Sequence, residues 1–259
     1  LFFGMFFNNL FFWCANQMIV QKALAAKNLK ESQKGAIYLS LFKVFGPLFT
    51  VLPGVVAFNY FNGSLDKSDN AYPALVTSVL PEWAFGLFGA VIFGAILSSF
   101  VGSLNSTTTL LTLDFYKPIF GKNKSDKHIA RVGHIATVVI GVIVVALAPV
   151  ISLFPSGLYA LVQQFNGVYS MPVLALILVA FFSKRTSKLG AKVTLFTHII
   201  LYAIISFVFT EINYLYTFSV LFFVDLIIIL IFNKVKPSSE FDLNTHQPKV
   251  DMTPWKYRY

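Results

Sequence analysis

The chain has 259 residues, of which 56% are hydrophobic and only 12% are charged, and its mean hydropathy is +0.71. Soluble globular proteins carry about 25% charged residues, so this composition excludes an ordinary soluble domain and indicates a protein of the lipid bilayer. The single cysteine, Cys14, excludes an internal disulfide and a zinc site built from several thiolates. The formal net charge of +9 does not require nucleic acid as a partner, because the positions of the basic residues have another explanation.

Apolar stretches long enough to cross a bilayer, about 20 residues each, occur along the whole chain. The predicted spans are 1–20, 36–60, 84–116, 131–152, 157–182, 192–210 and 214–232. The sequence therefore predicts an all-α polytopic membrane protein with about seven spans. The run "YPALVTSVLP", between the second and third spans, predicts a short additional helix. Because the chain opens inside an apolar run and not at a methionine, we expect it to be a fragment of a longer membrane protein.

The basic residues are distributed unevenly between the two sides of the predicted membrane. The segments that hold all of them except Lys43 and Lys67 are 22–34, 117–131, 184–192 and 234–258. If every span crosses once, these segments lie on one side, and short cytoplasmic loops carry the excess of Lys and Arg. We therefore predict a multi-pass transmembrane region over residues 1–232 in the plasma (inner) membrane. Its basic loops would be cytoplasmic, as would a juxtamembrane segment over residues 233–259.

Small and hydroxyl-bearing residues interrupt the third span in "GAILSSFVGSLNSTTTLLTLDFY". Ala95, Ser98 and Ser99 are spaced i, i+3 and i+4, so they share one helix face. Two hydroxyls and a backbone carbonyl suit a hard cation such as sodium, which prefers oxygen ligands. Small residues also allow helices to pack closely, so the pattern alone fits either role. The polar residues 105–109 could line a wet path, or their hydroxyls could bond back to their own helix.

The first span contains "NNLFFWCANQ", in which Asn9, Phe12 and Asn16 would share one face of a continuous helix. An amide beside an aromatic ring suits a polyol, because the amide bonds hydroxyls and the ring covers an apolar sugar face. The alternative is a contact between helices through the amide, worth about 0.6 kcal/mol.

Several other polar side chains fall inside predicted spans, where such groups are rare and often functional. Lys43 could either snorkel toward the headgroups or donate to a bound ligand. Gln163 and its neighbour Gln164 point to different faces, so at most one of them faces a given site. We interpret Asp225 as a structural carboxylate that is partnered or protonated, and His198 as a packed or hydrogen-bonded helix residue.

Three stretches resemble the sodium:solute symporter family, in particular its sodium/glucose (galactose) cotransporter branch. "WCANQMIVQKALAAKNL" resembles the family's first span of the second repeat, and "ILSSFVGSLNSTTTLLTLDFYK" resembles its ion-site helix. "LVQQFNGVYSMPVLALILVAFFSKR" resembles its sugar-contacting helix. The resemblance implies a LeuT-like fold with two inverted five-helix repeats around a site at the bilayer midplane. The chain would then hold the second repeat and two peripheral helices, with the first repeat of the full-length chain absent.

The resemblance also implies roles for individual residues. Asn9, Lys43 and Gln163 match sugar contacts, and Phe12 stands where a gating tyrosine is found. Ala95 matches a sodium-ligating carbonyl, with Ser98 and Ser99 as the hydroxyls of the same sodium half-site. Phe12 lacks the tyrosine hydroxyl. Moreover, no Gly or Pro between Gly4 and the end of the first span marks the broken helix that this fold requires.

The predicted function is therefore sodium-coupled symport of a glucose- or galactose-like sugar by alternating access. Its partners would be the sugar, sodium as the coupling ion and the lipid bilayer, with no further cofactor. One alternative is a related symporter for inositol, a sialic acid, an amino acid or an anion; another is a receptor that binds ligand without flux. No set of catalytic residues is visible in the sequence, so we do not predict an enzyme.

Overall fold

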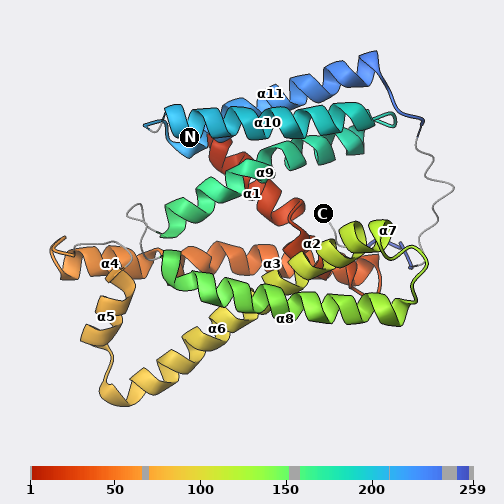
Figure 1. The fold of residues 1–259 in the computed structure, drawn as a ribbon. Coiled ribbons are helices and arrows are strands. Elements are labelled where there is room, and N and C mark those ends of the chain that lie inside the picture. The colour runs from red at the N-terminus through yellow and green to blue at the C-terminus, as the bar shows by residue number, and fades with distance from the viewer. Residues whose placement is uncertain (1, 66–69, 152–157, 210, 241–249, 257–259) are drawn as a thin grey trace. The chain divides into compact units, whose positions relative to one another are not determined.

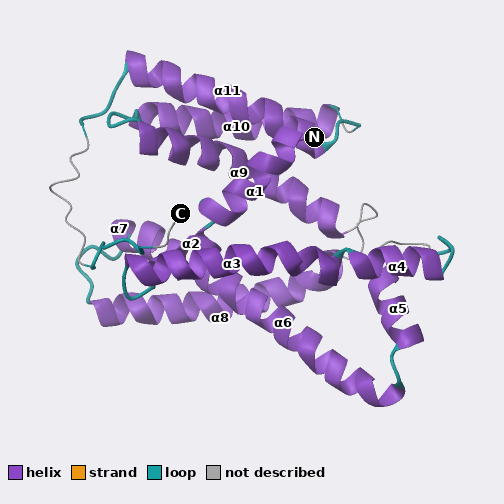
Figure 2. Cartoon of the chain, turned by 180° about the vertical axis from the view of Figure 1, so that it is seen from behind, coloured by secondary structure: helices purple, strands orange, loops and turns teal. Residues whose placement is uncertain are grey.

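The structure, a computed structural model, describes residues 2–65, 70–151, 158–209, 211–240 and 250–256. All secondary structure in these ranges is helical, without a strand among them (Figures 1 and 2). The elements are α1 (Phe2–Cys14), α2 (Gln17–Leu24), α3 (Leu29–Thr50), α4 (Leu52–Tyr60), α5 (Ala71–Val79), α6 (Glu82–Thr109), the π-helix η2 (Leu110–Tyr116), α7 (Lys117–Ile119), α8 (Asp126–Ile151), α9 (Leu158–Phe182), α10 (Lys188–Val208) and α11 (Tyr214–Val235). The prediction of an all-α polytopic membrane protein is confirmed.

Six helical segments in the described part of the chain are long and apolar enough to cross a membrane. They coincide with the second to seventh predicted spans. The first predicted span differs, because two short helices, α1 and α2, replace one continuous helix. The short helix expected between the second and third spans is present as α5. Residues 152, 157 and 210 of the predicted spans, and Lys67, Lys249 and Arg258 of the charge pattern, lie outside the described residues.

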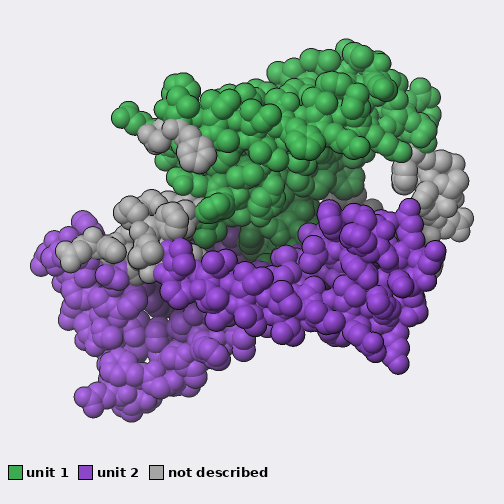
Figure 3. All heavy atoms as spheres, in the orientation of Figure 1, with its two compact units in different colours: residues 1–34, 159–259 green, residues 35–158 purple. Residues whose placement is uncertain are grey.

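The chain divides into two compact units (Figure 3). Unit 1 consists of residues 1–34 and 159–259, and unit 2 of residues 35–158. This division follows packing between helices. The predicted boundary at residue 232 concerns the membrane and stays a prediction.

The core of unit 1 lies where α1, α9, α10 and α11 pack together, and α9 and α10 run side by side in both ribbon views (Figures 1 and 2). Its aromatic and aliphatic residues include Phe7, Phe11, Met171, Leu174, Tyr202, Phe218 and Phe222. The rings of Phe7 and Phe222 stack with centroids 3.9 Å apart. At Gly4, α1 approaches α11 so closely that a β-carbon would collide with the carbonyl oxygen of Leu215. Glycine is therefore required where these two helices cross.

We expect Gly4→Ala to lower the free energy of unfolding by about 1–3 kcal/mol, the usual cost of overpacking. Gly86→Ala is the matched control, because a β-carbon built at Gly86 meets no described atom within 4 Å apart from its chain neighbours and the nearby backbone of its own helix. The Gly86→Ala variant should have an unchanged free energy of unfolding, or one that is up to about 1 kcal/mol higher because alanine has the greater helix propensity. Thermal unfolding of the purified protein in detergent checks both variants, and equal midpoints would contradict the close crossing.

In unit 2, α6 and η2 pack along α8, and small residues of α8 form the seam. A β-carbon at Gly133 would lie 3.5 Å from the Thr112 hydroxyl oxygen, and one at Gly141 would lie 3.5 Å from Leu104 Cδ2. Small residues allow such close approach between membrane helices. The hydroxyl of Tyr116 and Nε2 of His128 are hydrogen-bonded at 3.0 Å, which ties the end of η2 to α8.

Hydrogen bonds within unit 1 join two of the basic segments, 22–34 and 184–192, to the chain that follows α11. The N–H of Leu29 donates to the Asp251 carbonyl at 3.1 Å, and the N–H of Trp255 donates to Gln33 Oε1 at 2.7 Å. Arg185 Nη2 donates to Glu240 Oε2 at 3.0 Å. These bonds connect the predicted cytoplasmic segments 22–34 and 184–192 to the chain that follows α11.

Candidate functional site

The helix break between α1 and α2 is the main feature of the N-terminal region. The carbonyl of Phe11 accepts hydrogen bonds from the N–H groups of both Ala15 and Asn16, each at 2.9 Å, which ends α1. Asn16 then has an extended backbone (φ −69°, ψ 126°), and its side chain accepts a bond from the Met18 N–H at 2.9 Å. Asparagine at an N-cap stabilises the start of a new helix in this way. Asn16 is therefore a helix cap, and the expectation that it shares a continuous helix face with Asn9 and Phe12 is wrong.

Asn16→Ala removes this cap, and we expect it to cost about 1 kcal/mol of stability. Asn16→Asp keeps an accepting oxygen and should retain most of that stability, so it serves as the matched control. Denaturant unfolding of the purified protein, followed by circular dichroism, measures the difference. A result in which the Ala and Asp variants are equally stable would contradict the capping role.

Asn9 and Phe12 lie on the last two turns of α1, directly before the break. Asn9 Nδ2 donates to the Met5 carbonyl at 2.9 Å, and the Asn9 side chain is exposed. Phe12 is 39% exposed, and its ring meets Trp13 edge-on with centroids 5.1 Å apart. Both side chains are therefore accessible to a ligand from the surface of unit 1.

Gln163 belongs to a polar row on α9, which we name the α9 polar row: Gln163, Asn166 and Tyr169. Asn166 Nδ2 donates to Gln163 Oε1 at 3.3 Å, and the Tyr169 hydroxyl donates to Asn166 Oδ1 at 3.0 Å. Tyr169 also meets Phe11 of α1 edge-on, with ring centroids 5.7 Å apart. The α9 polar row is thus linked to the end of α1, where Phe12 follows Phe11.

Sequence reasoning identified Gln163 but missed the other two members of the α9 polar row. A signal for them was present, because Asn166 and Tyr169 follow Gln163 at i+3 and i+6 and so continue one helix face. Gln163 is only 8% exposed, whereas Tyr169 is 44% exposed. The row therefore runs from a buried amide to an accessible hydroxyl.

Two side chains of α10 hold the backbone of α9 beside the α9 polar row. The Tyr202 hydroxyl donates to the Gln164 carbonyl at 2.7 Å, and His198 Nε2 is 3.0 Å from the Gly167 carbonyl oxygen. His198 Nδ1 is in turn 2.7 Å from Asp225 Oδ2 of α11. The interpretations of His198 as a hydrogen-bonded residue and of Asp225 as a partnered carboxylate are confirmed.

The remaining predicted site residues belong to unit 2. Lys43 lies on α3, and Ala95, Ser98 and Ser99 lie within α6. All four residues are exposed to solvent in this structure. The three α6 residues fall within a continuous helix, so their spacing places them on one face, as predicted. The structure thus places Asn9, Phe12 and Gln163 in one unit and these four residues in the other.

Three threonines that follow Ser99 on α6 bond back to their own helix. The hydroxyls of Thr107, Thr108 and Thr109 donate to the carbonyls of residues three or four positions earlier, at 2.7–3.2 Å. A cavity of about 360 Å³ nevertheless opens beside Thr108 and Thr109, and Lys117 and Asp126 also line it. Thr107, Thr108 and Thr109 thus bond back to their own helix, and the wet path along this stretch stays a prediction.

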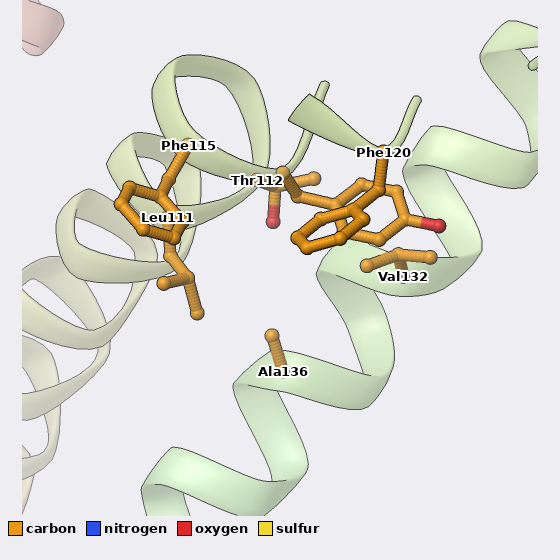
Figure 4. Close-up of a pocket in the computed structure, with 7 residues that line it drawn as sticks. Leu111, Thr112, Phe115, Phe120, Val132 and Ala136 are labelled. Carbon is orange, nitrogen blue, oxygen red and sulfur yellow. The ribbon is translucent and has the colours of Figure 1, made fainter. Parts of the chain in front are cut away.

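A second cavity, of about 180 Å³, lies between η2 and α8 (Figure 4). Leu111, Phe115, Phe120 and Val132 line it, and the hydroxyl of Thr112 points into the same space. The lining is almost entirely apolar, so this cavity does not suit an ion or a sugar, which need several polar partners.

The chain is similar to known membrane transporters. The Sodium:solute symporter family matches over residues 1–198. The Uncharacterized symporter YidK of Escherichia coli is 39% identical over 254 residues, which are 98% of this chain and 44% of that protein. The Sodium/glucose cotransporter of Vibrio parahaemolyticus is 33% identical over 204 residues, or 73% of this chain and 37% of its own length. The human Sodium/myo-inositol cotransporter 2 is 31% identical over 206 residues, which are 73% of this chain and 30% of that protein. The chain thus spans less than half the length of these relatives.

Proposed function

Because the chain belongs to the sodium:solute symporter family, we propose that it forms part of a transporter that couples uptake of a sugar to the entry of sodium. The transporter would work by alternating access in the plasma (inner) membrane. The remainder of the full-length chain would supply the first repeat of a LeuT-like fold. The basic segments would be cytoplasmic. The bonds that join Leu29, Gln33 and Arg185 to the chain after α11 support a location of these segments on one side of the membrane.

The observation that carries this proposal is the helix break at Ala15 and Asn16. Substrate sites of such transporters are built at discontinuous helices, where irregular backbone borders a polar cavity. Here the break directly follows Asn9 and Phe12, and Phe11 on the same turn contacts the α9 polar row. Asn9 and Gln163 would bond sugar hydroxyls, Lys43 would donate a further bond, and the ring of Phe12 would cover one face of the sugar.

Sodium would bind at the α6 face formed by the Ala95 carbonyl and the hydroxyls of Ser98 and Ser99, completed by the first repeat. Each sodium ion that enters a compartment 100 mV negative inside releases about 2.3 kcal/mol. A tenfold concentration gradient adds about 1.4 kcal/mol. Together these terms, about 3.7 kcal/mol, sustain an accumulation of several hundredfold for one sodium ion.

The substrate class is the second part of the proposal. Two of the relatives are named for glucose and for myo-inositol, which are both cyclic polyols. An amide-and-ring site suits either compound, since it bonds hydroxyls and covers a carbon face. Myo-inositol is therefore the second candidate substrate.

Competition for uptake tests the substrate class. Proteoliposomes that contain the full-length transporter would take up labelled galactose or glucose in the presence of external sodium. Unlabelled glucose, galactose and myo-inositol should compete, whereas proline and sialic acid should not. Competition by proline or sialic acid alone would keep a sodium symporter but reject a polyol as its substrate.

A further inference from the structure

Unit 1 contains a polar cluster that the proposed transport site does not use. It consists of Ser170 on α9, Thr194 and His198 on α10, and Asp225 on α11, and we name it the buried polar cluster. All four residues have a relative exposure of 0%. The cluster therefore lies in the interior of unit 1, between α9, α10 and α11.

The hydrogen bonds of His198 fix the number of protons in the cluster. Nε2 of His198 faces the carbonyl oxygen of Gly167 at 3.0 Å, and since a carbonyl can only accept, Nε2 carries a hydrogen. Nδ1 lies 2.7 Å from Asp225 Oδ2, so one further proton must lie between these two atoms. Whether that proton belongs to the imidazole or to the carboxyl group, His198 and Asp225 together are electrically neutral.

Three polar atoms of the buried polar cluster are left over. Asp225 Oδ1, Ser170 Oγ and Thr194 Oγ1 are buried and have no hydrogen-bond partner among the described residues. An unpartnered buried polar group costs about 1–3 kcal/mol, and most such groups in proteins have a protein or water partner. Three in one cluster therefore point to a ligand that completes them.

Helix geometry places the residues that carry these three atoms at neighbouring levels of α9, α10 and α11. Thr194 precedes His198 by four residues on α10, and Ser170 follows Gly167 by three residues on α9, so each pair shares a helix face. His198 bonds both Gly167 and Asp225, which joins the three helices at one level. Ser170 and Thr194 thus lie within about one helical turn, 5.4 Å along the axis, of residues that meet at His198. Pro172 adds to the polarity of this stretch, because it has no N–H to bond the Val168 carbonyl as an unbroken helix would.

The ligand must both donate and accept hydrogen bonds. Asp225 Oδ1 faces it as an acceptor when the carboxylate is ionised, while the two hydroxyls have protons to donate. A sodium ion meets the need for oxygen ligands, but it would add an unbalanced positive charge to a neutral pair deep in the bundle, which is costly. A water molecule adds no charge, and buried waters make about three hydrogen bonds to otherwise unsatisfied groups.

We infer that a single water molecule is bound between α9, α10 and α11, donating to Asp225 Oδ1 and accepting from Ser170 and Thr194. The site joins the three helices through a neutral network of hydrogen bonds. It does not depend on the identity of the transported solute, so its test and the test of the transport function can fail separately.

Deleting one hydroxyl has opposite effects with and without this water. If the water is bound, Thr194→Val and Ser170→Ala each remove one of its partners, and the unfolding equilibrium constant should rise about 5- to 100-fold. If the hydroxyls are truly unpartnered, the same substitutions remove a buried unsatisfied group and should stabilise the protein. Ser219→Ala is the matched control, because the Ser219 hydroxyl donates to its own helix at the Leu215 carbonyl, at 3.0 Å. Stabilisation by Thr194→Val would overturn the proposal.

Radiolytic labelling with ¹⁸O-water tests the site in the unmodified full-length protein, so the result does not depend on a variant that folds. A bound water forms hydroxyl radicals next to buried side chains, so His198 and the neighbouring Met171, both with 0% exposure, should be labelled. In the Ser170→Ala/Thr194→Val variant their labelling should fall several-fold, while labelling of Met252, which is 51% exposed, stays constant. Absence of label at both buried residues in the unmodified protein would overturn the proposal. So would a melting temperature that rises with sodium in a Thr194-dependent manner, since that result indicates a cation.

Discussion

Asp225→Ala is expected to lower the free energy of unfolding by about 3–5 kcal/mol, the range found when one partner of a buried pair is removed. His198 and Asp225 are both fully buried, and their side chains meet at 2.7 Å. Alanine removes the carboxylate that pairs with the Nδ1 of His198 and leaves this buried polar nitrogen without its partner. The second bond of His198, to the Gly167 carbonyl, then loses the group that orients the imidazole.

Asp225→Asn is the matched control, because its amide can donate to Nδ1 while His198 keeps its bond from Nε2 to Gly167. We expect that variant to lose only about 1 kcal/mol, the value of one hydrogen bond. A double-mutant cycle measures the coupling energy between the two residues. It compares the free energies of unfolding, in detergent, of the unmodified protein, Asp225→Ala, His198→Ala and the double variant. A coupling energy near zero would contradict a paired interaction in the folded protein.

Ser98→Ala is expected to weaken sodium binding by about 10- to 100-fold in the full-length transporter. Hydrogen bonds and contacts to charged groups contribute about 1.5–3 kcal/mol each, and every 1.4 kcal/mol corresponds to a factor of ten. The measurement is the sodium concentration that gives half-maximal sugar uptake in proteoliposomes. Saturating sodium should restore part of the uptake, because the substitution would remove only one of the several proposed oxygen ligands.

Thr107→Val is the control for Ser98→Ala, because it removes another exposed hydroxyl of the same helix. Thr107 follows Ser98 by nine residues of α6, about 13–14 Å along the helix axis, so we do not expect its hydroxyl to reach an ion bound at Ser98. Its half-maximal sodium concentration should stay unchanged. An equal shift in both variants would contradict the assignment of sodium to the Ser98 face.

The sequence predicted the membrane spans well because their signal is local. Each apolar stretch from 36–60 onward is helical at the expected place in the described residues, although 36–60 is divided between α3 and α4 and 84–116 between α6 and η2. The short helix α5 was also predicted. Hydropathy cannot separate a continuous helix from two half-helices of the same composition, so α1 and α2 were predicted as one span.

The break in that first span had a signal of a different kind. Glycine and proline were the expected markers, and neither occurs there. The break depends on Asn16, whose side chain bonds the Met18 N–H and thereby competes with the helix. An asparagine with an apolar helical run on either side is compatible with both a helix interior and a cap, so the sequence left the position undecided.

The buried pair shows what a single sequence cannot specify. His198 and Asp225 were each interpreted correctly as structural, but their partnership depends on how α10 and α11 align, 27 residues apart in the chain. The same limit applies to the candidate site. Asn9, Phe12 and Gln163 were predicted one by one, whereas the α9 polar row and its contact with Phe11 depend on the packing of α1 against α9.

Accumulation against a concentration gradient shows most directly whether sodium entry drives sugar uptake. Proteoliposomes with the full-length transporter would be given a tenfold inward sodium gradient and a potential of about 100 mV, negative inside. We predict that labelled galactose or glucose accumulates above its external concentration, toward a limit of several hundredfold for one sodium ion. Replacement of external sodium by potassium should abolish the accumulation. Internal sugar that only reaches the external concentration, or uptake that is equal in sodium and potassium, would contradict sodium-driven symport.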